Sequence, residues 1–399
     1  FGWKGLGAVM GQTGRKSEAI NANQKSATLA PQDAEAHYNL GITFQVLGRL
    51  DEAKASYTET IALKPDHARA HYNLGITLHE LGKLDEAKAS YTQAIVVKPD
   101  YAEAHSNLSN TLLELGRPDE AEASCRQAIA LKPDLAGAHT NLGNTLNALG
   151  KLKEAEVSLR EAIVLKPGIT AAHNNLGNTL KELGRPDEAF ASYNQAIKVN
   201  IGYSEAYSNK NLCLNYSSLW SPLFIFEQHL EFGKQFGGLQ TESLLSPRSN
   251  LRADKRLRVG YVSGDFRKHS VAYFFEPLLQ HHNSNVVETF CYYNNAPVDE
   301  MTERLMATSD HWRSIVGITD SNVANLIRND KIDILVDLSG HTAKNRLLVF
   351  AQKPAPIQVT WLGYVNTTGL SEIDYRFTDL VADPIGEADE LHSETLVRL

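Results

Sequence analysis

The sequence predicts an α-solenoid of helical hairpins followed by an α/β lobe with a parallel sheet. Two observations support this fold class. Residues 1–200 repeat themselves every 34 residues without an insertion, whereas from Leu257 onward short apolar runs alternate with longer amphipathic ones. A fixed period of this length is typical of stacked structural repeats. Strand-like runs that alternate with helical ones are typical of a parallel sheet covered by helices.

The repeat can be followed through residues that return in phase. A proline returns from Pro31 onward, and a Leu-Gly pair such as Leu47 and Gly48 separates the two halves of each unit. Glycine favours the end of a helix and proline cannot continue one, so each unit is predicted to hold two antiparallel helices. Six units are visible, and the first is led by Trp3. A histidine also recurs, at His37, His71, His105, His139 and His173.

Apolar and small residues form one stripe on each predicted helix. Gly41 and Phe44 share a face of the first helix of their unit, and Ala53 and Tyr57 share a face of the second. A small residue such as Gly41 lets the two helices cross closely. The pattern resembles the tetratricopeptide (TPR) repeat, in which a single unit cannot bury its apolar face but a stack can.

The composition argues against several classes of partner and site. Lys and Arg number 39 against 47 Asp and Glu, a net charge of −8, so neither a nucleic acid nor an anionic membrane is a predicted partner. Cys125, Cys213 and Cys291 are widely spaced, so no disulfide framework and no metal site is predicted, and a reducing, cytoplasmic location is expected. No apolar run approaches the roughly 20 residues that span a bilayer. Because the chain does not begin with Met, we expect it to be part of a longer protein.

After Asn200 the repeat decays, and Tyr207 takes the place of the recurrent histidine. We therefore predict a TPR superhelix over residues 1–200, a degenerate repeat and helical bridge over 201–250, and a Rossmann-like α/β lobe over 251–399. In this lobe the predicted strands are residues 257–263, 287–293, 332–338, 357–362 and 373–378. The predicted helices are residues 271–281, 298–309, 321–329 and 343–352.

Ligands of such sheets bind at the carboxyl ends of the strands, so the loops 264–270, 339–345 and 363–369 are the candidate site. The first loop places His269 close to a helix start, where a histidine can act as acid or base because it titrates near neutrality; a helix cap is the open alternative. The second loop contains His341 among other polar residues, and the third offers hydroxyls and flexible backbone suited to a sugar or a phosphate. The alternative for the second loop is that its polar residues are solvated caps, and the alternative for the third is that its residues serve only the turn.

Three stretches together resemble a known family. They are LRVGYVSGDFRKHSVAYFFEP (257–277), DILVDLSGHTAKNRLLVFAQKPAPIQVTWLGYVNTTGLSEIDYRFTD (333–379) and ETLVRL (394–399). They resemble the amino-terminal catalytic lobe of the nucleotide-sugar protein O-glycosyltransferases, the family of TPR-linked O-GlcNAc transferases and SPINDLY proteins. The resemblance covers essentially the whole chain. The GHT and NTTGL motifs are nearer the bacterial and SPINDLY-like branch.

This resemblance implies the N-terminal half of a two-lobed GT-B glycosyltransferase, with the active site between the lobes. It implies a metal-independent, inverting transfer of a sugar to Ser or Thr of a bound protein, without a cofactor. The expected donor is UDP-GlcNAc. Two alternatives stay open: a protein O-fucosyltransferase that uses GDP-fucose, and a non-catalytic TPR docking scaffold.

The resemblance also implies roles for single residues. His269 matches the essential histidine of the family's first motif, and Asp330 falls near an aspartate proposed as a base. His341 stands in the GHT motif and is expected to orient the site. The expected substrate-binding residues of the third loop are Gly363, Tyr364, Thr367, Thr368 and Gly369. Val365 departs from the family, which commonly has proline there, so the stiff turn that a proline would impose is not expected in this loop.

The repeats are expected to bind acceptor proteins as extended segments. The family resemblance implies a ladder of asparagines along the inner groove, at Asn39, Asn73, Asn107, Asn141 and Asn175. An amide side chain can pair with both the N–H and the C=O of a peptide. The alternative is that these amides bond between neighbouring repeats. The in-phase histidines are expected to pack rather than bind metal, and a homodimer through the repeats stays open.

The family's second lobe, which holds the nucleotide and neutralises its diphosphate, has no counterpart in these 399 residues. Stabilisation of the leaving group is the main electrostatic task of such a transfer. We therefore expect this chain by itself to bind nucleotide sugar weakly and to turn over poorly or not at all.

Overall fold

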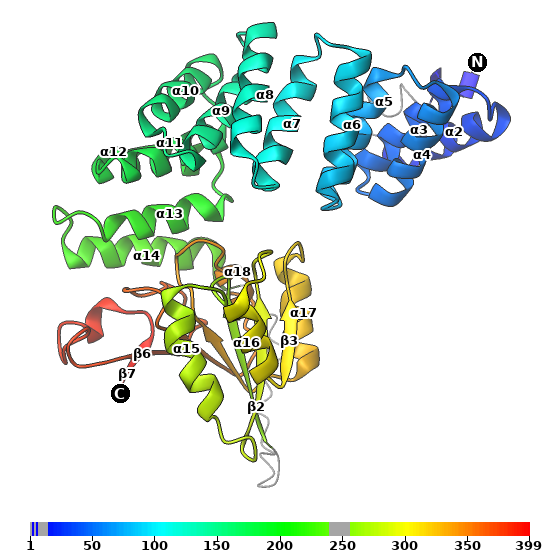
Figure 1. The fold of residues 1–399 in the computed structure, drawn as a ribbon. Helices are drawn as coiled ribbons and strands as arrows, with labels where there is room; N and C mark the ends of the chain where they lie inside the picture. The colour runs from blue at the N-terminus through cyan, green and yellow to red at the C-terminus, as the bar shows by residue number, and fades with distance from the viewer. Residues whose placement is uncertain (1, 4, 7–14, 239–255) are drawn as a thin grey trace. The chain divides into compact units, whose positions relative to one another are not determined.

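The computed structural model describes residues 15–238 and 256–399, together with residues 2, 3, 5 and 6 (Figure 1). The chain forms two compact units, Phe1–Leu183 and Gly184–Leu399. The boundary lies one helix before residue 200, where the sequence places the end of the repeats. Among the described residues, no helix combines the length and the apolar character needed to cross a bilayer.

The first unit is a stack of antiparallel helix pairs that follow one another in chain order (Figure 1). This confirms the α-solenoid that the 34-residue period predicts. Its helices are α2 (Lys16–Leu29), α3 (Ala34–Val46), α4 (Leu50–Leu63), α5 (Ala68–Glu80), α6 (Leu84–Val97), α7 (Ala102–Glu114), α8 (Pro118–Leu131), α9 (Ala136–Ala148), α10 (Leu152–Leu165) and α11 (Thr170–Glu182).

Each in-phase residue of the repeat has a local structural task. The glycine after the first helix of a pair adopts a left-handed conformation, with φ of 71° at Gly48 and 73° at Gly116, which a residue with a Cβ adopts at a cost. The recurrent histidine donates from Nε2 to the carbonyl oxygen of the proline six residues earlier, at 3.0 Å from His37 to Pro31 and 2.9 Å from His71 to Pro65. The histidines therefore close the turns between units.

The two helices of a pair cross where one of them carries a small residue. A Cβ added at Gly41 would lie 2.6 Å from the ring of Tyr57, and the same clash returns at Gly75 and Gly143. In the third pair the glycine is replaced by Ser109, and the facing position holds the small Cys125 in place of tyrosine. A larger residue on one helix is thus accompanied by a smaller residue on the other, as close packing requires.

We predict that this compensation can be reproduced at another pair. Gly41→Ser alone should destabilise the chain by about 2 kcal/mol, because the new side chain overlaps the Tyr57 ring. Combined with Tyr57→Cys, the same change should cost less, with a coupling energy of about 1–3 kcal/mol in urea unfolding. Strictly additive effects would contradict the volume argument.

The second unit begins with three helices and continues into the α/β lobe. The helices are α12 (Pro186–Val199), α13 (Ser204–Leu214) and α14 (Pro222–Phe236). The strands are β1 (Leu257–Ser263), β2 (Val287–Tyr293), β3 (His311–Ser314), β4 (Ile334–Asp337), β5 (Ile357–Trp361), β6 (Tyr375–Thr378) and β7 (Thr395–Arg398). The remaining helices are α15 (Ser270–His281), α16 (Glu300–Thr308), α17 (Asp320–Asp330), the short α18 (Leu347–Phe350) and the 3₁₀ turn η2 (Asp389–Leu391).

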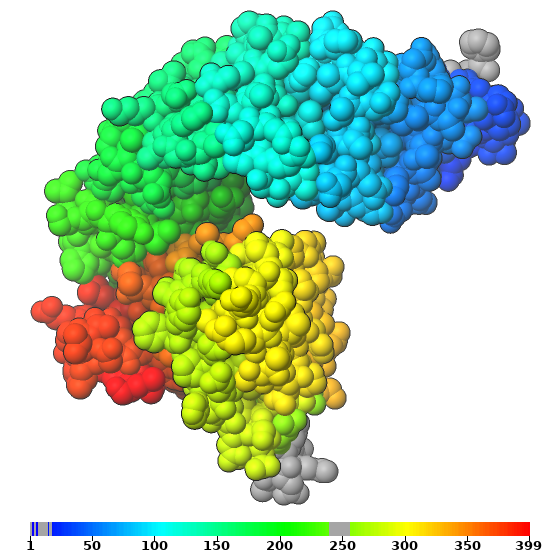
Figure 2. Space-filling view, viewed as in Figure 1, coloured from blue at the N-terminus to red at the C-terminus, as the bar shows by residue number. Residues whose placement is uncertain are grey.

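The strands form one parallel sheet in the order β3-β2-β1-β4-β5-β6-β7. One core cluster includes Leu335 and Ile327, and another includes Val336 and Phe275, so helices cover both faces of the sheet. α15 and α16 lie side by side on one face, joined by a 2.7 Å contact between Arg304 Nε and Glu276 (Figure 1, Figure 2). This arrangement confirms the Rossmann-like lobe.

Two strands of the sheet have no counterpart in the sequence-based prediction. β3 and β7 have four residues each, and most of their side chains are half-buried, so neither shows a continuous apolar run. The predicted helix at 343–352 shrinks to α18, because Lys344 takes a left-handed conformation and interrupts it. The other predicted elements are confirmed with shifts of a few residues at their ends.

Candidate active site

The chain order reverses between β1 and β4, and the loops that follow these two strands meet at their carboxyl ends. A Cβ added at Gly264 would lie 2.6 Å from the Lys344 Cβ. Asn294, which follows β2, donates from Nδ2 to the Lys344 carbonyl oxygen at 2.8 Å. Such a reversal point is where open parallel sheets bind their ligands.

His269 is the N-cap of α15. Its Nδ1 accepts the backbone N–H of Val271 at 3.3 Å and lies 3.8 Å from the Asp265 carboxylate. Because Nδ1 is an acceptor, the proton of the neutral ring sits on Nε2. The side chain is 37% exposed, and no hydrogen bond within the described ranges uses Nε2. The cap that the sequence offered as an alternative role is therefore present, and it leaves Nε2 available as a donor.

Asp330 lies away from these loops. It ends α17 directly before β4, which puts it at the amino-terminal end of that strand. Its carboxylate accepts from the Tyr292 hydroxyl at 2.8 Å and from Arg313 Nη2 at 3.3 Å. The structure does not bring Asp330 together with His269, and its contacts join α17 to β2 and β3.

Asp337 shapes the loop that follows β4. Its buried carboxylate accepts from the backbone N–H of Ser339 at 3.1 Å and of Gly340 at 2.8 Å, and from the Thr360 hydroxyl at 2.8 Å. Burial raises the pKa of Asp337 to about 6, although these three donors favour its charged form. The sequence analysis did not single out this residue, which ends the most apolar strand of the lobe.

His341 is enclosed and joins two elements. Its Nε2–H donates to the Thr368 carbonyl oxygen at 2.9 Å, and its Nδ1 accepts from the Ser208 hydroxyl at 3.1 Å. The ring also contacts Phe232 and Tyr364 edge-on. Burial holds the pKa of His341 well below its ordinary value. A neutral ring without solvent access positions the loop after β5 and is not placed to exchange protons with a substrate.

Tyr364 also faces inward. Its hydroxyl donates to His229 Nε2 at 2.7 Å and accepts from Asn215 Nδ2 at 3.0 Å. His229 donates from Nδ1 to the Ile225 carbonyl oxygen, and burial lowers the pKa of His229 to about 4. The Tyr364 side chain is 4% exposed, so it ties the loop to α13 and α14 and leaves no hydroxyl for a substrate.

The two threonines of this loop bind a buried carboxylate. Glu394 accepts from the Thr367 hydroxyl at 2.6 Å, from the Thr368 N–H at 2.8 Å and from the Thr368 hydroxyl. On the other side of the loop, Arg376 Nη1 donates to the carbonyl oxygens of Tyr364 at 3.1 Å and Asn366 at 2.9 Å. The hydroxyls that the sequence assigns to the substrate are thus occupied within the lobe.

Two glycines of the loop permit close contacts of the backbone. A Cβ added at Gly363 would lie 1.8 Å from the Leu338 carbonyl oxygen, which joins the loops after β4 and β5. A Cβ at Gly369 would lie 2.0 Å from the His229 carbonyl oxygen, and one at Gly233 would lie 1.9 Å from the Gly369 carbonyl oxygen. α14 therefore crosses this loop at a separation that only glycine allows.

The asparagines of the repeats bond between neighbouring units. Asn73 and Asn107 donate from Nδ2 to the hydroxyls of Tyr38 and Tyr72 at 3.2 and 3.1 Å, and Asn141 donates to the Ser106 carbonyl oxygen at 2.9 Å. This is the alternative that the sequence left open. It commits the amide nitrogen, so only the side-chain oxygen remains to pair with a peptide. The asparagines at 39 and 175 occupy the same half-buried position.

The shifted pKa values of His229 and Asp337 make the free energy of unfolding depend on pH. Between pH 4 and 6.5 the unfolded chain binds a proton at His229 that the folded chain does not, so the stability present above pH 6.5 is lost as the pH falls. Asp337 acts in the opposite direction, because its raised pKa removes stability as the pH rises towards 6. His229→Gln should therefore lower the slope of unfolding free energy against pH by about 1.4 kcal/mol per unit.

Urea denaturation across this pH range measures the slope. The matched control is His281→Gln, at the exposed end of α15. An unchanged slope in His229→Gln would contradict the buried neutral ring.

Comparisons with known proteins agree with this architecture. Residues 237–399 match the model of glycosyl transferase family 41, and residues 2–211 match a model described as the cilia and flagella-associated protein 70 C-terminal domain, a TPR model. A solved mutant of the Thermobaculum terrenum O-GlcNAc transferase superposes with a TM-score of 0.68 and 36% identity, over 75% of this chain and 57% of that one.

Curated relatives from plants and animals are named as UDP-N-acetylglucosamine–peptide N-acetylglucosaminyltransferases. A rice protein named as a probable UDP-N-acetylglucosamine–peptide N-acetylglucosaminyltransferase SPINDLY is 44% identical over 48% of this chain and 21% of its own length. The UDP-N-acetylglucosamine–peptide N-acetylglucosaminyltransferase of Caenorhabditis elegans is 36% identical over 37% of this chain and 13% of its own length. The match thus spans about a fifth or less of these relatives. The chain is thus similar to the O-GlcNAc transferases and SPINDLY proteins, and it joins a TPR array to a segment that matches glycosyl transferase family 41.

Proposed function

We propose that this chain forms the acceptor-binding array and the first lobe of a protein O-glycosyltransferase. The reaction transfers a sugar, GlcNAc from UDP-GlcNAc, to Ser or Thr of proteins bound by the repeats. The observation that carries the proposal is His269, held as a helix cap at the sheet's reversal point with its Nε2–H available. The names of the relatives support the donor and the protein acceptor.

In the transfer, the acceptor oxygen forms a bond to the anomeric carbon of the sugar, the bond from that carbon to the nucleotide diphosphate breaks, and the hydroxyl proton passes to an oxygen of the departing diphosphate. The cap contact decides which ring nitrogen of His269 meets the substrate. With Nδ1 accepting from Val271, the Nε2–H can donate to an oxygen of the sugar or of the acceptor.

The loop after β5 would bind the donor through its backbone. Its threonine hydroxyls are engaged by Glu394, whereas no hydrogen bond within the described ranges uses the backbone N–H groups of Tyr364, Val365 and Asn366. Successive free N–H groups suit the oxygens of a phosphate. Because Arg376 and Glu394 hold the loop on both sides, these donors are preorganised, which is the main source of electrostatic stabilisation in enzymes.

The proposal places the protein in the cytoplasm. The three cysteines are buried and, within the described ranges, none of them forms a disulfide, which suits a reducing compartment.

Two substitutions at His269 separate catalysis from capping. His269→Ala removes both the imidazole and the cap, whereas His269→Asn keeps a good N-cap and removes only the imidazole. If Nε2 acts in the transfer, both variants of the full-length protein should lose about 10²-fold or more in activity. Mass spectrometry of acceptor peptides incubated with UDP-GlcNAc or GDP-fucose measures transfer and identifies the donor. Full activity of His269→Asn would assign the residue to capping alone.

The 399-residue chain alone is expected to bind the donor weakly. Arg376, which holds the loop after β5, is paired with Asp383, so within that loop the diphosphate would meet only the neutral backbone N–H donors. We expect a dissociation constant for UDP-GlcNAc of about 1 mM or weaker, which corresponds to about −4 kcal/mol. Titration calorimetry checks this, and micromolar affinity would overturn the expectation.

A further inference from the structure

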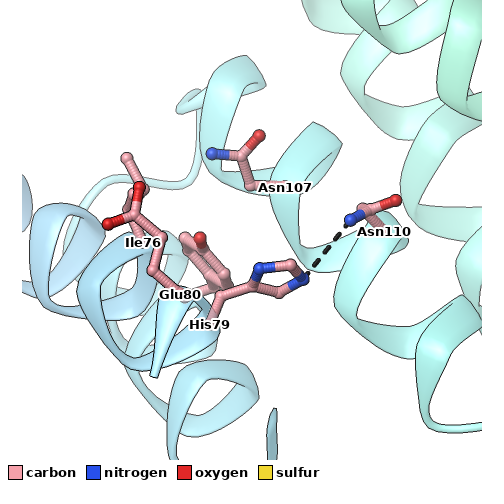
Figure 3. A pocket seen from close by; sticks show the side chains of 6 residues that line it. Ile76, His79, Glu80, Asn107 and Asn110 are labelled. Atoms are coloured by element: carbon pink, nitrogen blue, oxygen red, sulfur yellow. Dashed lines mark hydrogen bonds between the residues drawn. The ribbon is translucent and has the colours of Figure 1, made fainter. Parts of the chain in front are cut away.

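A small pocket lies between α5 and α7 of the first unit, apart from the lobe that carries His269. Its volume is about 180 Å³. Figure 3 shows side chains from both helices around it, with Asn107 across from Glu80. The lining residues are Ile76, His79, Glu80, Tyr91, Asn107 and Asn110.

The neighbouring unit shows what is special about this pocket. In that unit the Tyr57 hydroxyl donates to Gln45 Oε1 at 2.8 Å. The equivalent residues 34 positions later are Tyr91 and His79. The His79 ring contacts α7 instead of the tyrosine hydroxyl. Its Nε2 lies 3.0 Å from Glu114 Oε1 and 3.3 Å from Asn110 Nδ2 (Figure 3). The second tyrosine has therefore lost the acceptor that the first one has.

Tyr91 is 2% exposed, and no acceptor within the described ranges lies at hydrogen-bond distance from its O–H. Because Tyr91 lines the pocket, its hydroxyl can donate to a ligand that supplies an acceptor there. Asn107 Nδ2 is committed to the Tyr72 hydroxyl at 3.1 Å, which leaves Asn107 Oδ1 as an acceptor. The pocket thus offers one donor and one acceptor, the complement of a peptide group.

The rim of the pocket is acidic. Glu80 is exposed and forms no ion pair within the described ranges, whereas Glu114 is paired with His79. The glutamate is not a general feature of the repeat, since Val46 and Ala148 occupy equivalent positions in other units. A free carboxylate beside a peptide-binding pair favours a cation at that point.

We infer that this pocket selects an extended peptide with a lysine or arginine. A backbone carbonyl of the peptide accepts from the Tyr91 O–H, the adjacent N–H donates to Asn107 Oδ1, and the basic side chain reaches Glu80. The inference rests on the proposed binding of acceptor segments by the repeats. It adds a charge preference at one defined unit.

The test uses the full 399-residue chain and fluorescence anisotropy. The probes are two pools of short fluorescein-labelled peptides rich in Ser, Thr, Val and Ala, one with a central lysine and one with a central glutamine. The lysine pool should bind about fivefold or more tightly than the glutamine pool. Glu80→Gln should abolish this ratio and leave the glutamine pool unaffected. Glu182→Gln, at the equivalent position of a later unit, is the control for net charge and should preserve the ratio.

Tyr91→Phe should weaken both pools about equally, with an unchanged melting temperature, because no hydrogen bond within the protein is lost. Tyr57→Phe breaks the bond to Gln45 and should lower the melting temperature without affecting either pool. Equal binding of the two pools to the unmodified chain, or a lysine preference that survives Glu80→Gln, would overturn the inference. The proposed transferase activity is judged separately, since loss of transfer in full-length protein with the lysine preference intact would refute that activity alone.

Discussion

The second unit depends on the close crossing of α14 over the loop that follows β5. Gly233 and Gly369 bring the two backbones together at a distance that no Cβ permits. Around this contact lie two buried imidazoles, His229 bonded to Tyr364 and His341 bonded to the Thr368 carbonyl oxygen. Because both rings have been taken out of water, they remain neutral and act as fixed hydrogen-bond partners. A polar network of this kind has one satisfied arrangement, and it therefore defines the conformation of the loop.

The chemistry of the site follows from this rigidity. In the loop after β5, the threonine hydroxyls donate to Glu394, and two backbone carbonyl oxygens accept from Arg376. The groups that remain for a substrate are therefore backbone N–H groups in a fixed arrangement. Across the reversal point, His269 is fixed in the same manner, because its Nδ1 contact with Val271 sets both the ring orientation and the tautomer. In each case a contact within the protein decides which atom is presented outward. Such preorganisation is what lets neutral donors stabilise developing charge.

The repeats show how a periodic scaffold acquires a local specificity. The period maintains the backbone and the turns from unit to unit, and the helix crossing accommodates the exchange of glycine and tyrosine for Ser109 and Cys125. A change at a single lining position has a different effect. With His79 in place of the glutamine that serves Tyr57, the Tyr91 hydroxyl lacks that acceptor and lines a polar pocket. The array can thus vary its ligand contacts without disturbing the stack.

The sequence by itself determined the repeat period, the order of most strands and helices, and the loops that form the candidate site, because these depend on local periodicity and on helix stops. Only the tertiary structure decided what the loop residues do. Tyr364 and Thr367 look alike in sequence to substrate-binding hydroxyls, yet their partners His229 and Glu394 lie 135 and 27 residues away, and no local pattern predicts such pairs. Asp330 likewise follows a helix that returns to the amino-terminal end of β4. Burial and long-range hydrogen bonds, which are properties of the packed chain, assign each polar side chain to the interior or to a substrate.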